Sequence, residues 1–510
     1  MNVVLTPAGV SAAGVVAVAR GDAGASLGAD ARAAMERSAA VLAALVDSDQ
    51  AAYGVTTGFG SLALVPIPAG RREELQRALI RSHAAGMGPP IEREVVRAMM
   101  LLRARTLAMG CSGARPLVAE SLLALLNAGL TPVVPEHGSL GASGDLAPLA
   151  HCALAIIGEG EVVGPDGTRR PAAEALASAG IQPLVLSAKE GLALINGTDG
   201  MLGMLVLALA DLQALLPVAD IAAAMSVEAL LGTDRAFAAE LVGLRPQAGQ
   251  AISAANLRAL LTGSEVVASH RHGDPRVQDA YSLRCAPQVA GAARDTVAYA
   301  TSVAEAELRS AIDNPMVLAD GRVESCGNFH GAPVAFACDF LAIAAAETGS
   351  IAERRTDRLL DGTRSHGLPP FLAQDPGVNS GLMLAHYAQA SMVAENRRLA
   401  APASVDSLPT SAMQEDHVSM GWGAARKLRL AVANLTRILA VELGCAARAL
   451  DLRSPLSPGP GTAAALAAIR ERIPGPGPDR CLAPELAEIE LLVSSGELLT
   501  AVRRRIGALP

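Results

Sequence analysis

The stretch "EHGSLGASGDLAPLAH", from Glu136 to His151, gathers small residues around one serine and one carboxylate. In its centre, Ala142, Ser143 and Gly144 are followed directly by Asp145. Three interpretations fit such a stretch: a serine nucleophile, a simple glycine-rich turn, or a reaction of the backbone itself. Each makes a different demand on the rest of the chain.

The serine-nucleophile interpretation fails on pattern and on context. A hydrolase elbow has the pattern Gly-x-Ser-x-Gly on a turn between a strand and a helix. Gly141 and Ser143 match it, but Asp145 stands in the place of the second glycine. The elbow also requires alternating strands and helices, which the second half of the chain does not predict. As a plain turn, the stretch would use glycine for positive φ and Asp145 to cap a helix starting at "LAPLAHCALAII".

Backbone chemistry gives every residue of the stretch a reason. In a tight turn the Gly144 nitrogen can attack the Ala142 carbonyl carbon and close a five-membered ring with loss of water. Loss of a second water from Ser143 leaves an exocyclic methylidene, so the product is the electrophile 4-methylideneimidazole-5-one (MIO). Gly144 is unhindered, Ala142 leaves space, and Ser143 carries the β-hydroxyl. Asp145 is placed to assist proton transfers, and the folded turn replaces a bimolecular encounter.

The elements that must position this stretch are predicted to be mainly helical. Of 510 residues, 51% are hydrophobic but only 2% are aromatic, so the apolar residues are chiefly Ala, Leu and Val, and Ala and Leu favour helices. Long helical patterns cover 200–232, 286–312, 333–358, 380–399 and 422–451, which favours a bundle. A small hairpin is expected around Gly164 to Pro171. We predict an all-α fold with a loop-rich N-terminal region (1–197) carrying the reactive stretch and a long-helix bundle (198–510), in one continuous fold.

Composition also excludes several classes of partner. The net charge is −8 without a long basic block, which argues against nucleic acid. Asp211 and Gln213 interrupt the apolar run from Met201, so it predicts a buried helix and no membrane span. No secretory signal is evident, and seven scattered cysteines without a CxxC pair favour a cytoplasmic protein with reduced thiols. His270 and His272 are expected in an exposed loop, and neither a metal nor a nucleotide is expected.

Eight polar, mostly glycine-rich segments carry a resemblance that extends over nearly the whole chain. In order they are "YGVTTGFG", "SHAAGMG", "GSLGASGDLAPLAH", "EGLALINGT", "QDAYSLRC", "DNPMV", "GNFHGAPVA" and "PASVDSLPTSAMQEDHVSMG". By these segments the chain resembles the aromatic amino acid ammonia-lyases, which make MIO from Ala-Ser-Gly, and most closely their histidine-specific members. The resemblance implies conversion of L-histidine to trans-urocanate and ammonia, the first step of histidine breakdown. It also implies a homotetramer with active sites shared between subunits.

Two alternatives stay open. A related MIO-dependent lyase or an aminomutase would use the same electrophile on tyrosine or phenylalanine, and sequence separates these outcomes poorly. A non-catalytic helical scaffold, from a different class, would leave the clustered polar loop residues without a purpose.

The resemblance also implies roles for residues outside the reactive stretch. The reaction needs an electrophile for the α-amine, a base for the β-proton, a carboxylate clamp and a ring pocket. Tyr53 is the implied base, and Arg284 is the implied clamp, because a guanidinium binds a carboxylate through two hydrogen bonds. Tyr281, three residues earlier, would share a helical face with Arg284 and shuttle protons near the electrophile. Gln278 would belong to the same site.

The remaining implied residues bind the substrate. Asn196 would hydrogen-bond the prosthetic group or the substrate carboxylate, and Phe329 would pack beside the ring. His83 and Glu415 favour histidine, because an imidazole needs polar partners and such a site discriminates against rings that lack them.

Two positions depart from the family pattern. Ala280 stands where many relatives have proline, and Met413 where asparagine is frequent, so we expect differences in pocket shape but not in chemistry.

Overall fold

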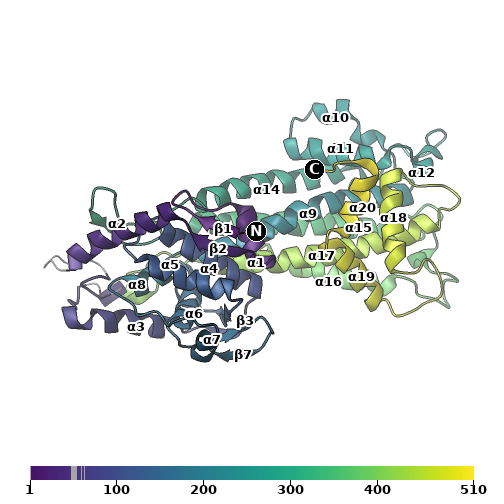
Figure 1. Ribbon diagram of the computed structural model, residues 1–510. Coiled ribbons are helices and arrows are strands. Elements are labelled where there is room, and N and C mark those ends of the chain that lie inside the picture. Colours follow the sequence, from purple (N-terminus) through teal and green to yellow (C-terminus); the bar gives the residue numbers. More distant parts are fainter. Residues whose placement is uncertain (1, 47–53, 59, 63) are drawn as a thin grey trace. The chain divides into compact units, whose positions relative to one another are not determined.

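The computed structural model describes residues 2–46, 54–58, 60–62 and 64–510, and it is mainly helical, as the sequence predicts (Figure 1). The chain groups into two compact units. Unit 1 comprises 1–207, 301–339 and 402–426, and unit 2 comprises 208–300, 340–401 and 427–510. The division falls within the long helices α9 (Asp199–Ala229), α14 (Ala286–Glu307), α15 (Ala332–Leu360) and α17 (Gly421–Asp451). The sequence division after residue 197 stays a prediction, because these units are defined by spatial contact.

The shorter helices belong to one unit each. Unit 1 contains α1 (Ala12–Arg20), α2 (Ala29–Val46), α3 (Arg72–His83), α4 (Arg93–Ala108), α5 (Pro116–Asn127), α6 (Leu146–Ile156), α7 (Ala172–Ser178) and α8 (Glu190–Ile195). Unit 2 contains α10 (Ala239–Gly243), α11 (Ala248–Leu261), α12 (Glu265–Ala268), α13 (Tyr281–Arg284), α16 (Met383–Leu399), α18 (Pro460–Arg472), α19 (Ala483–Ser494) and α20 (Glu497–Ile506).

The strands are short and lie in unit 1. Their bounds are β1 (Asn2–Leu5), β2 (Gly24–Leu27), β3 (Met87–Pro90), β4 (Thr131–Pro132), β5 (Pro135–His137), β6 (Glu161–Val163), β7 (Arg169–Pro171), β8 (Met316–Val317) and β9 (Val323–Glu324). β1 and β2 pair in parallel, and the other pairs, β3–β5, β4–β6–β7 and β8–β9, are antiparallel. The β6–β7 pair, with Val162 opposite Arg170, confirms the predicted hairpin.

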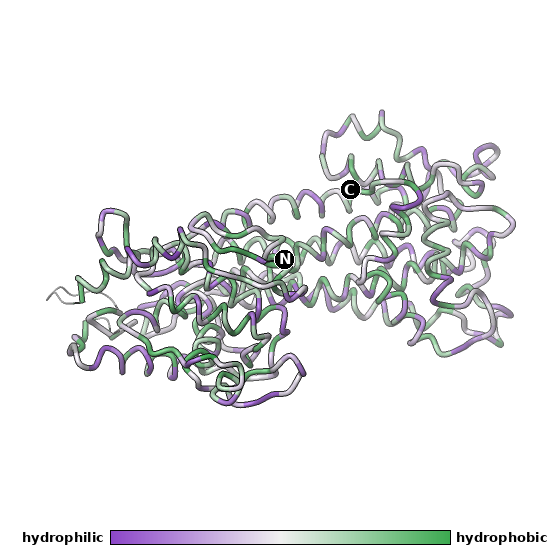
Figure 2. The backbone as a smooth tube through the Cα atoms, in the orientation of Figure 1, coloured by the Kyte–Doolittle hydropathy of each residue, from purple (hydrophilic) through white to green (hydrophobic). Residues whose placement is uncertain are grey.

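The apolar periodicity of α17 predicts its buried face correctly. Leu428, Leu435 and Leu439 are fully buried, because residues three or four apart share a helical face. Figure 2 shows hydrophobic and hydrophilic positions alternating along the helices in the same way. The other four predicted long helices are also present, and α9 contains the predicted buried run from Met201.

Among the residues that the structure describes, three helical stretches are long and apolar enough to cross a membrane: Glu190–Ala229, Ala332–Leu360 and Gly421–Asp451. In their most apolar windows 78%, 61% and 72% of the residues are buried inside the protein. Their hydropathy is therefore largely accounted for by packing within the protein.

The helix predicted for 286–312 ends earlier, at Glu307. Beyond it, the carbonyls of Ser310 and Ile312 accept hydrogen bonds from the buried side chains of Arg105 and Arg103. These guanidinium groups lie on α4 and satisfy carbonyls that no further helical turn serves. Because the periodicity of 286–312 does not contain this information, the predicted end was wrong. The early end directs the next residues, including Asp313, into the interior of unit 1.

We predict that the buried Arg355–Glu442 pair of unit 2 contributes strongly to stability. Glu442 accepts from Arg355 Nη2 at 2.9 Å and from Ser226 Oγ at 2.7 Å, and it is fully buried. Glu442→Gln leaves the guanidinium uncompensated and should lower the free energy of unfolding by about 3 kcal/mol or more, measured by urea denaturation. Glu74→Gln, which breaks an exposed pair with Arg71, is the control and should leave the urea midpoint nearly unchanged. Equal midpoints for the two variants would contradict the prediction.

Candidate functional site

The reactive stretch is pressed against the residues that precede α9. Gly144 has φ +76°, and a Cβ atom there would lie 2.2 Å from the carbonyl oxygen of Gly197. The backbone N–H of Asp145 donates to this same carbonyl at 2.7 Å. Glycine is therefore required at position 144 both for its positive φ and for the close approach. Ala142 and Ser143, next to it, are half-buried.

Asp145 occupies the N-cap position of α6, but its side chain does not cap that helix. Its Oδ2 instead accepts from the backbone N–H groups of Gly200 and Met201, both at 2.9 Å, in the first turn of α9. Its Oδ1 accepts from Ser139 Oγ at 3.0 Å. The capping role that the plain-turn interpretation gave to Asp145 is wrong, because α9 offers two free N–H groups close by.

Burial decides the protonation of Asp145. It raises the pKa of this carboxyl from 3.8 to about 7, although the hydrogen bonds from Met201, Ser139 and Gly200 act in the opposite direction. Both protonation states are therefore populated near neutral pH. A carboxyl of this kind can both give up and take up a proton under ordinary conditions.

Ser143 is hydrogen-bonded to Asn196. The Ser143 hydroxyl lies 2.6 Å from Asn196 Oδ1. The amide nitrogen of Asn196 donates to Asp313 Oδ1 at 3.2 Å and to the carbonyl of Asn314 at 2.8 Å. Asn196 itself is buried at the end of α8.

A pocket of about 580 Å³ in unit 1 brings three of the predicted residues together: Ser143, His83 and Glu415. Its walls come from α3, α6 and α8, which pack on one another. Their apolar contribution consists of Leu75, Ala78, Leu79, Leu146, Leu192 and Ile195. An apolar pocket with a few converging polar groups is the usual form of a small-molecule site.

His83 lies at the end of α3 and offers a hydrogen-bond acceptor. Its Nδ1 lies 2.9 Å from the carbonyl oxygen of Leu79, which can only accept, so Nδ1 carries the proton. Burial lowers the pKa of His83 below its ordinary value, although the Leu79 bond and the charge of Glu415 act against it. His83 is therefore neutral at pH 7, with its Nε2 lone pair unprotonated.

Glu415 supplies the second acceptor of the pocket. One of its carboxylate oxygens accepts from Thr410 Oγ1 at 2.8 Å, and the two residues also form a backbone bridge. The pocket thus combines a neutral histidine and an oriented carboxylate near Ser143.

The segment from Ser419 to Trp422 holds the reactive stretch from another part of unit 1. The backbone N–H of Met420 donates to the Leu140 carbonyl at 2.9 Å, and Ser419 Oγ donates to that of Gly141 at 3.2 Å. Trp422 Nε1 donates to the Glu136 carbonyl at 2.8 Å. This tryptophan is the only one in the sequence and is almost fully buried.

The predicted clamp residues form a second group, in unit 2. Arg284 Nη1 donates to Gln278 Oε1 at 2.8 Å, and the guanidinium lies 4.6 Å from the ring centroid of Tyr281. The expectation that Tyr281 and Arg284 share a helical face is confirmed by α13. Tyr281 is 72% exposed in the single chain.

Two further predicted residues belong to neither group. Tyr53 lies outside the described residues. Phe329 is half-buried in the loop before α15 and is not among the described residues that line the pocket.

Sequence reasoning missed three residues of the site. Ser139 donates a hydrogen bond to Asp145. Lys189 and Asp313 form a buried ion pair behind Asn196, with 2.7 Å between the charged atoms. Ser139 lies within the reactive stretch and could have been found there. Within the part of the chain that the structure describes, no group of three or more His, Cys, Asp or Glu residues is arranged to hold a metal ion.

We predict that Asp145 makes stability depend on pH. The unfolded carboxyl ionises near pH 3.8 and the folded one near pH 7, so the folded state binds more protons between these values. The stability contributed by neutral Asp145 is complete below pH 3.8 and is lost as the pH rises through 7. The stability of Asp145→Asn relative to the parent chain should therefore increase as the pH rises from 3.8 to about 7 and stay constant above that, measured by thermal denaturation. Parallel curves for parent and variant, as expected for the exposed control Glu74→Gln, would contradict the prediction.

Comparisons with known proteins indicate the family of the chain. The family model "Aromatic amino acid lyase" matches residues 10–471. The histidine ammonia-lyase of Streptomyces avermitilis is 61% identical over 509 residues, covering 100% of this chain and 99% of the relative. The structure of histidine ammonia-lyase from Trypanosoma cruzi is 38% identical with a TM-score of 0.91, covering 99% of this chain and 96% of that one. That of tyrosine aminomutase from Streptomyces globisporus is also 38% identical, with a TM-score of 0.94 and coverage of 100% and 99%.

A family model that matches most of the chain, and relatives that match it from end to end, leave one assignment. The chain belongs to the aromatic amino acid lyase family.

Proposed function

We propose that the chain eliminates ammonia from L-histidine to give trans-urocanate, the reaction of a histidine ammonia-lyase and the first step of histidine breakdown. The observation that carries this proposal is the pocket that Ser143, His83 and Glu415 line together. It is supported by the Streptomyces relative, a histidine ammonia-lyase with which the chain shares 61% of its residues.

A tyrosine aminomutase activity is the second candidate, favoured by the TM-score of 0.94 to such an enzyme. The two ring-binding acceptors argue for histidine. With its Nδ1 donating to the Leu79 carbonyl, neutral His83 keeps Nε2 as an acceptor, and the Glu415 carboxylate is a second acceptor. A neutral imidazole carries its N–H donor on the ring itself, whereas phenylalanine offers no donor and tyrosine offers only the phenolic O–H beyond its ring. An acceptor left without a partner on burial is unfavourable.

We propose that MIO forms from Ala142, Ser143 and Gly144. The residues fit this group: a glycine is required at position 144, the Ser143 hydroxyl is held by Asn196, and a buried carboxyl titrating near pH 7 follows directly. The first water takes the Ala142 carbonyl oxygen, and the second takes the Ser143 hydroxyl together with the Ser143 α-proton. The group supplies an electrophile for the substrate amine.

The chain's own residues bind and orient the substrate. His83 Nε2 and Glu415 hold the imidazole ring, and the apolar walls of the pocket exclude water from it. Arg284, oriented by Gln278 and stacked on Tyr281, binds the substrate carboxylate in this proposal. Tyr53 takes the β-proton, Tyr281 passes protons near the reacting amine, and Phe329 packs beside the ring.

The proposal includes the assembly. The substrate is a small amino acid, and the enzyme is a cytoplasmic homotetramer whose active sites combine residues of different subunits. Neither nucleic acid nor a membrane takes part.

We predict that the purified protein releases ammonia from L-histidine and accumulates urocanate absorbance. Its intact mass should be lower than the sequence mass by two waters. Ser143→Ala should keep the fold, as judged by circular dichroism, lose the mass difference expected from maturation, and lose activity, because no β-hydroxyl can leave. Active protein with an unmodified mass would refute the electrophile, and a β-amino acid product would identify an aminomutase.

We predict that Glu415 sets the preference for imidazole. Glu415→Leu removes the acceptor and should lower kcat/KM for L-histidine by about 10- to 100-fold, the effect of one lost charged hydrogen bond. Glu415→Gln keeps an acceptor oxygen and should fall between parent and Leu variant. The ratio of L-phenylalanine to L-histidine turnover should rise most in the Leu variant. An unchanged ratio would show that Glu415 does not discriminate between the imidazole and phenyl rings of the substrates.

A further inference from the structure

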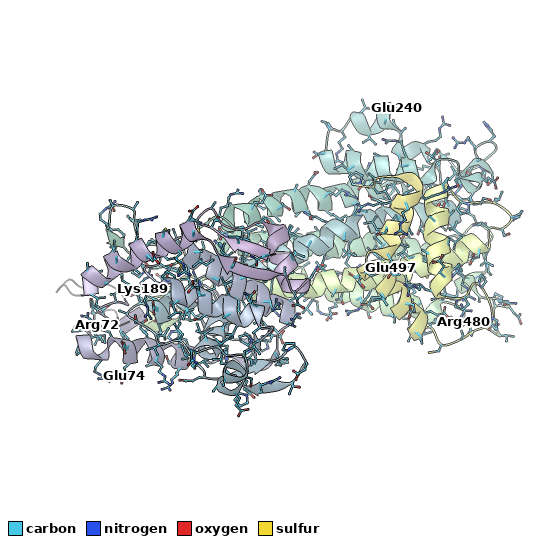
Figure 3. The ribbon with its side chains drawn as sticks, in the orientation of Figure 1. Arg72, Glu74, Lys189, Glu240, Arg480 and Glu497 are labelled. Atoms are coloured by element: carbon cyan, nitrogen blue, oxygen red, sulfur yellow. The ribbon has the colours of Figure 1, made fainter. Side chains whose placement is uncertain are left out.

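A buried ion pair lies behind the reactive serine, in unit 1. Lys189 Nζ donates to Asp313 Oδ2 at 2.7 Å and to the carbonyl of Ser112 at 2.8 Å. Both charged side chains are 1% exposed, and Figure 3 labels Lys189 among the helices of unit 1. A buried pair is not in itself strongly stabilising, because both ions lose their hydration. The further contacts of Asp313 indicate that the pair orients a neighbouring side chain.

The second oxygen of Asp313 determines the orientation of an amide. Asn196 Nδ2 donates to Asp313 Oδ1 at 3.2 Å and to the Asn314 carbonyl at 2.8 Å. An ionised carboxylate and a carbonyl can only accept hydrogen bonds, so the NH₂ end of Asn196 must face them. The oxygen end then faces Ser143, whose hydroxyl must donate across the 2.6 Å contact.

We propose that Lys189 and Asp313 are positioning residues that fix the amide of Asn196 and, through it, the hydroxyl of Ser143 for maturation. This inference rests on the proposed function, in which Ser143 loses that hydroxyl. A neutral group at position 313 could donate as well as accept, and the amide could then turn its NH₂ end toward Ser143. The Asp313 carboxylate is paired with the ammonium of Lys189 at 2.7 Å, and a carboxylate in an ion pair only accepts hydrogen bonds.

The pair also ties together the two ends of α8. Lys189 precedes the helix in the left-handed region, with φ +66°, and Asn196 follows it. Asp313 accepts from Lys189 through Oδ2 and from Asn196 through Oδ1, so it links both ends of the helix that forms one wall of the pocket.

The residue type at position 189 supports a specific role. The sequence contains only two lysines among its 42 cationic residues, the others being arginine. A compact ammonium can point at both the Asp313 oxygen and the Ser112 carbonyl, whereas a planar guanidinium requires more space and a fork of acceptors.

One consequence concerns substrate binding. Because its NH₂ end is occupied, Asn196 presents an oxygen to the pocket side. An oxygen acceptor binds an N–H donor such as the substrate amine and repels a carboxylate. Of the two partners considered for Asn196, we therefore expect the prosthetic group and not the substrate carboxylate.

The test compares four full-length variants with the parent chain. Lys189→Met leaves the Asp313 carboxylate without its cation, and Asp313→Asn leaves the Lys189 ammonium without its anion. The double variant removes both charges. Arg97→Met is the control: Arg97 is also a buried cation of unit 1, but it donates to the carbonyls of Val18 and Leu126 and does not contact Asn196. Each chain is made in a cell-free system, synthesis is stopped, and the loss of two waters is followed by intact mass. Thermal denaturation of each chain reports stability separately.

We expect maturation about tenfold slower in Lys189→Met, in Asp313→Asn and in the double variant, the effect of one misdirected charged hydrogen bond. Arg97→Met should mature at the parent rate even where its stability is lower. The double variant should regain stability, since no unpaired charge remains, but not the maturation rate. Maturation restored together with stability would show a purely structural pair and overturn the inference.

Two further outcomes separate this inference from the proposed function. If the parent loses two waters and all variants mature at its rate, only the positioning role falls. If the parent never loses two waters, the electrophile and the inference fall together.

Discussion

The contact between the reactive stretch and the start of α9 is the constraint on which the site depends. Gly144 approaches the Gly197 carbonyl so closely that no side chain fits between them, and the Asp145 N–H donates to the same oxygen. The Asp145 carboxyl then binds the first N–H groups of α9. A helix N-terminus favours negative charge, which offsets part of the unfavourable burial of this carboxyl. The loop is thus held by hydrogen bonds from backbone and carboxyl groups that would bind water in a solvent-exposed turn.

The polar interior of unit 1 is built around that contact. Arg103 and Arg105 on α4 end α14 early by binding carbonyls beyond it, and the chain that follows delivers Asp313 to Lys189 and Asn196. Segments from α4, α8 and the region after α14 therefore meet behind one serine. The buried side chains of Lys189, Asp313 and Asn196 find partners there from distant parts of the sequence, which is how a buried network imposes one arrangement.

Periodicity and motif together predicted much of this molecule. The five long helices and the β6–β7 hairpin follow from local patterns, because a helical or alternating repeat depends on neighbours in the chain. The resemblance placed Ser143, His83 and Glu415 in one site, and the pocket brings them together. The hydrogen bonds from α9 to Asp145, and the pairing of Asp313 with Lys189, could not be predicted, because these partners lie dozens of residues away and local propensity carries no trace of them. For the same reason the end of α14 was wrong, and the role of Tyr53 stays a prediction.

The buried indole of Trp422 has a practical consequence. It donates to the Glu136 carbonyl at the beginning of the reactive stretch, and a Cβ atom on Gly200 would lie 2.5 Å from its ring, beside the start of α9. Because the sequence contains one tryptophan and only four tyrosines, the intrinsic fluorescence of the chain comes almost entirely from this position. Trp422 is therefore an intrinsic fluorescent probe beside the reactive loop. Its emission reports the solvent exposure and the order of that loop without any added label.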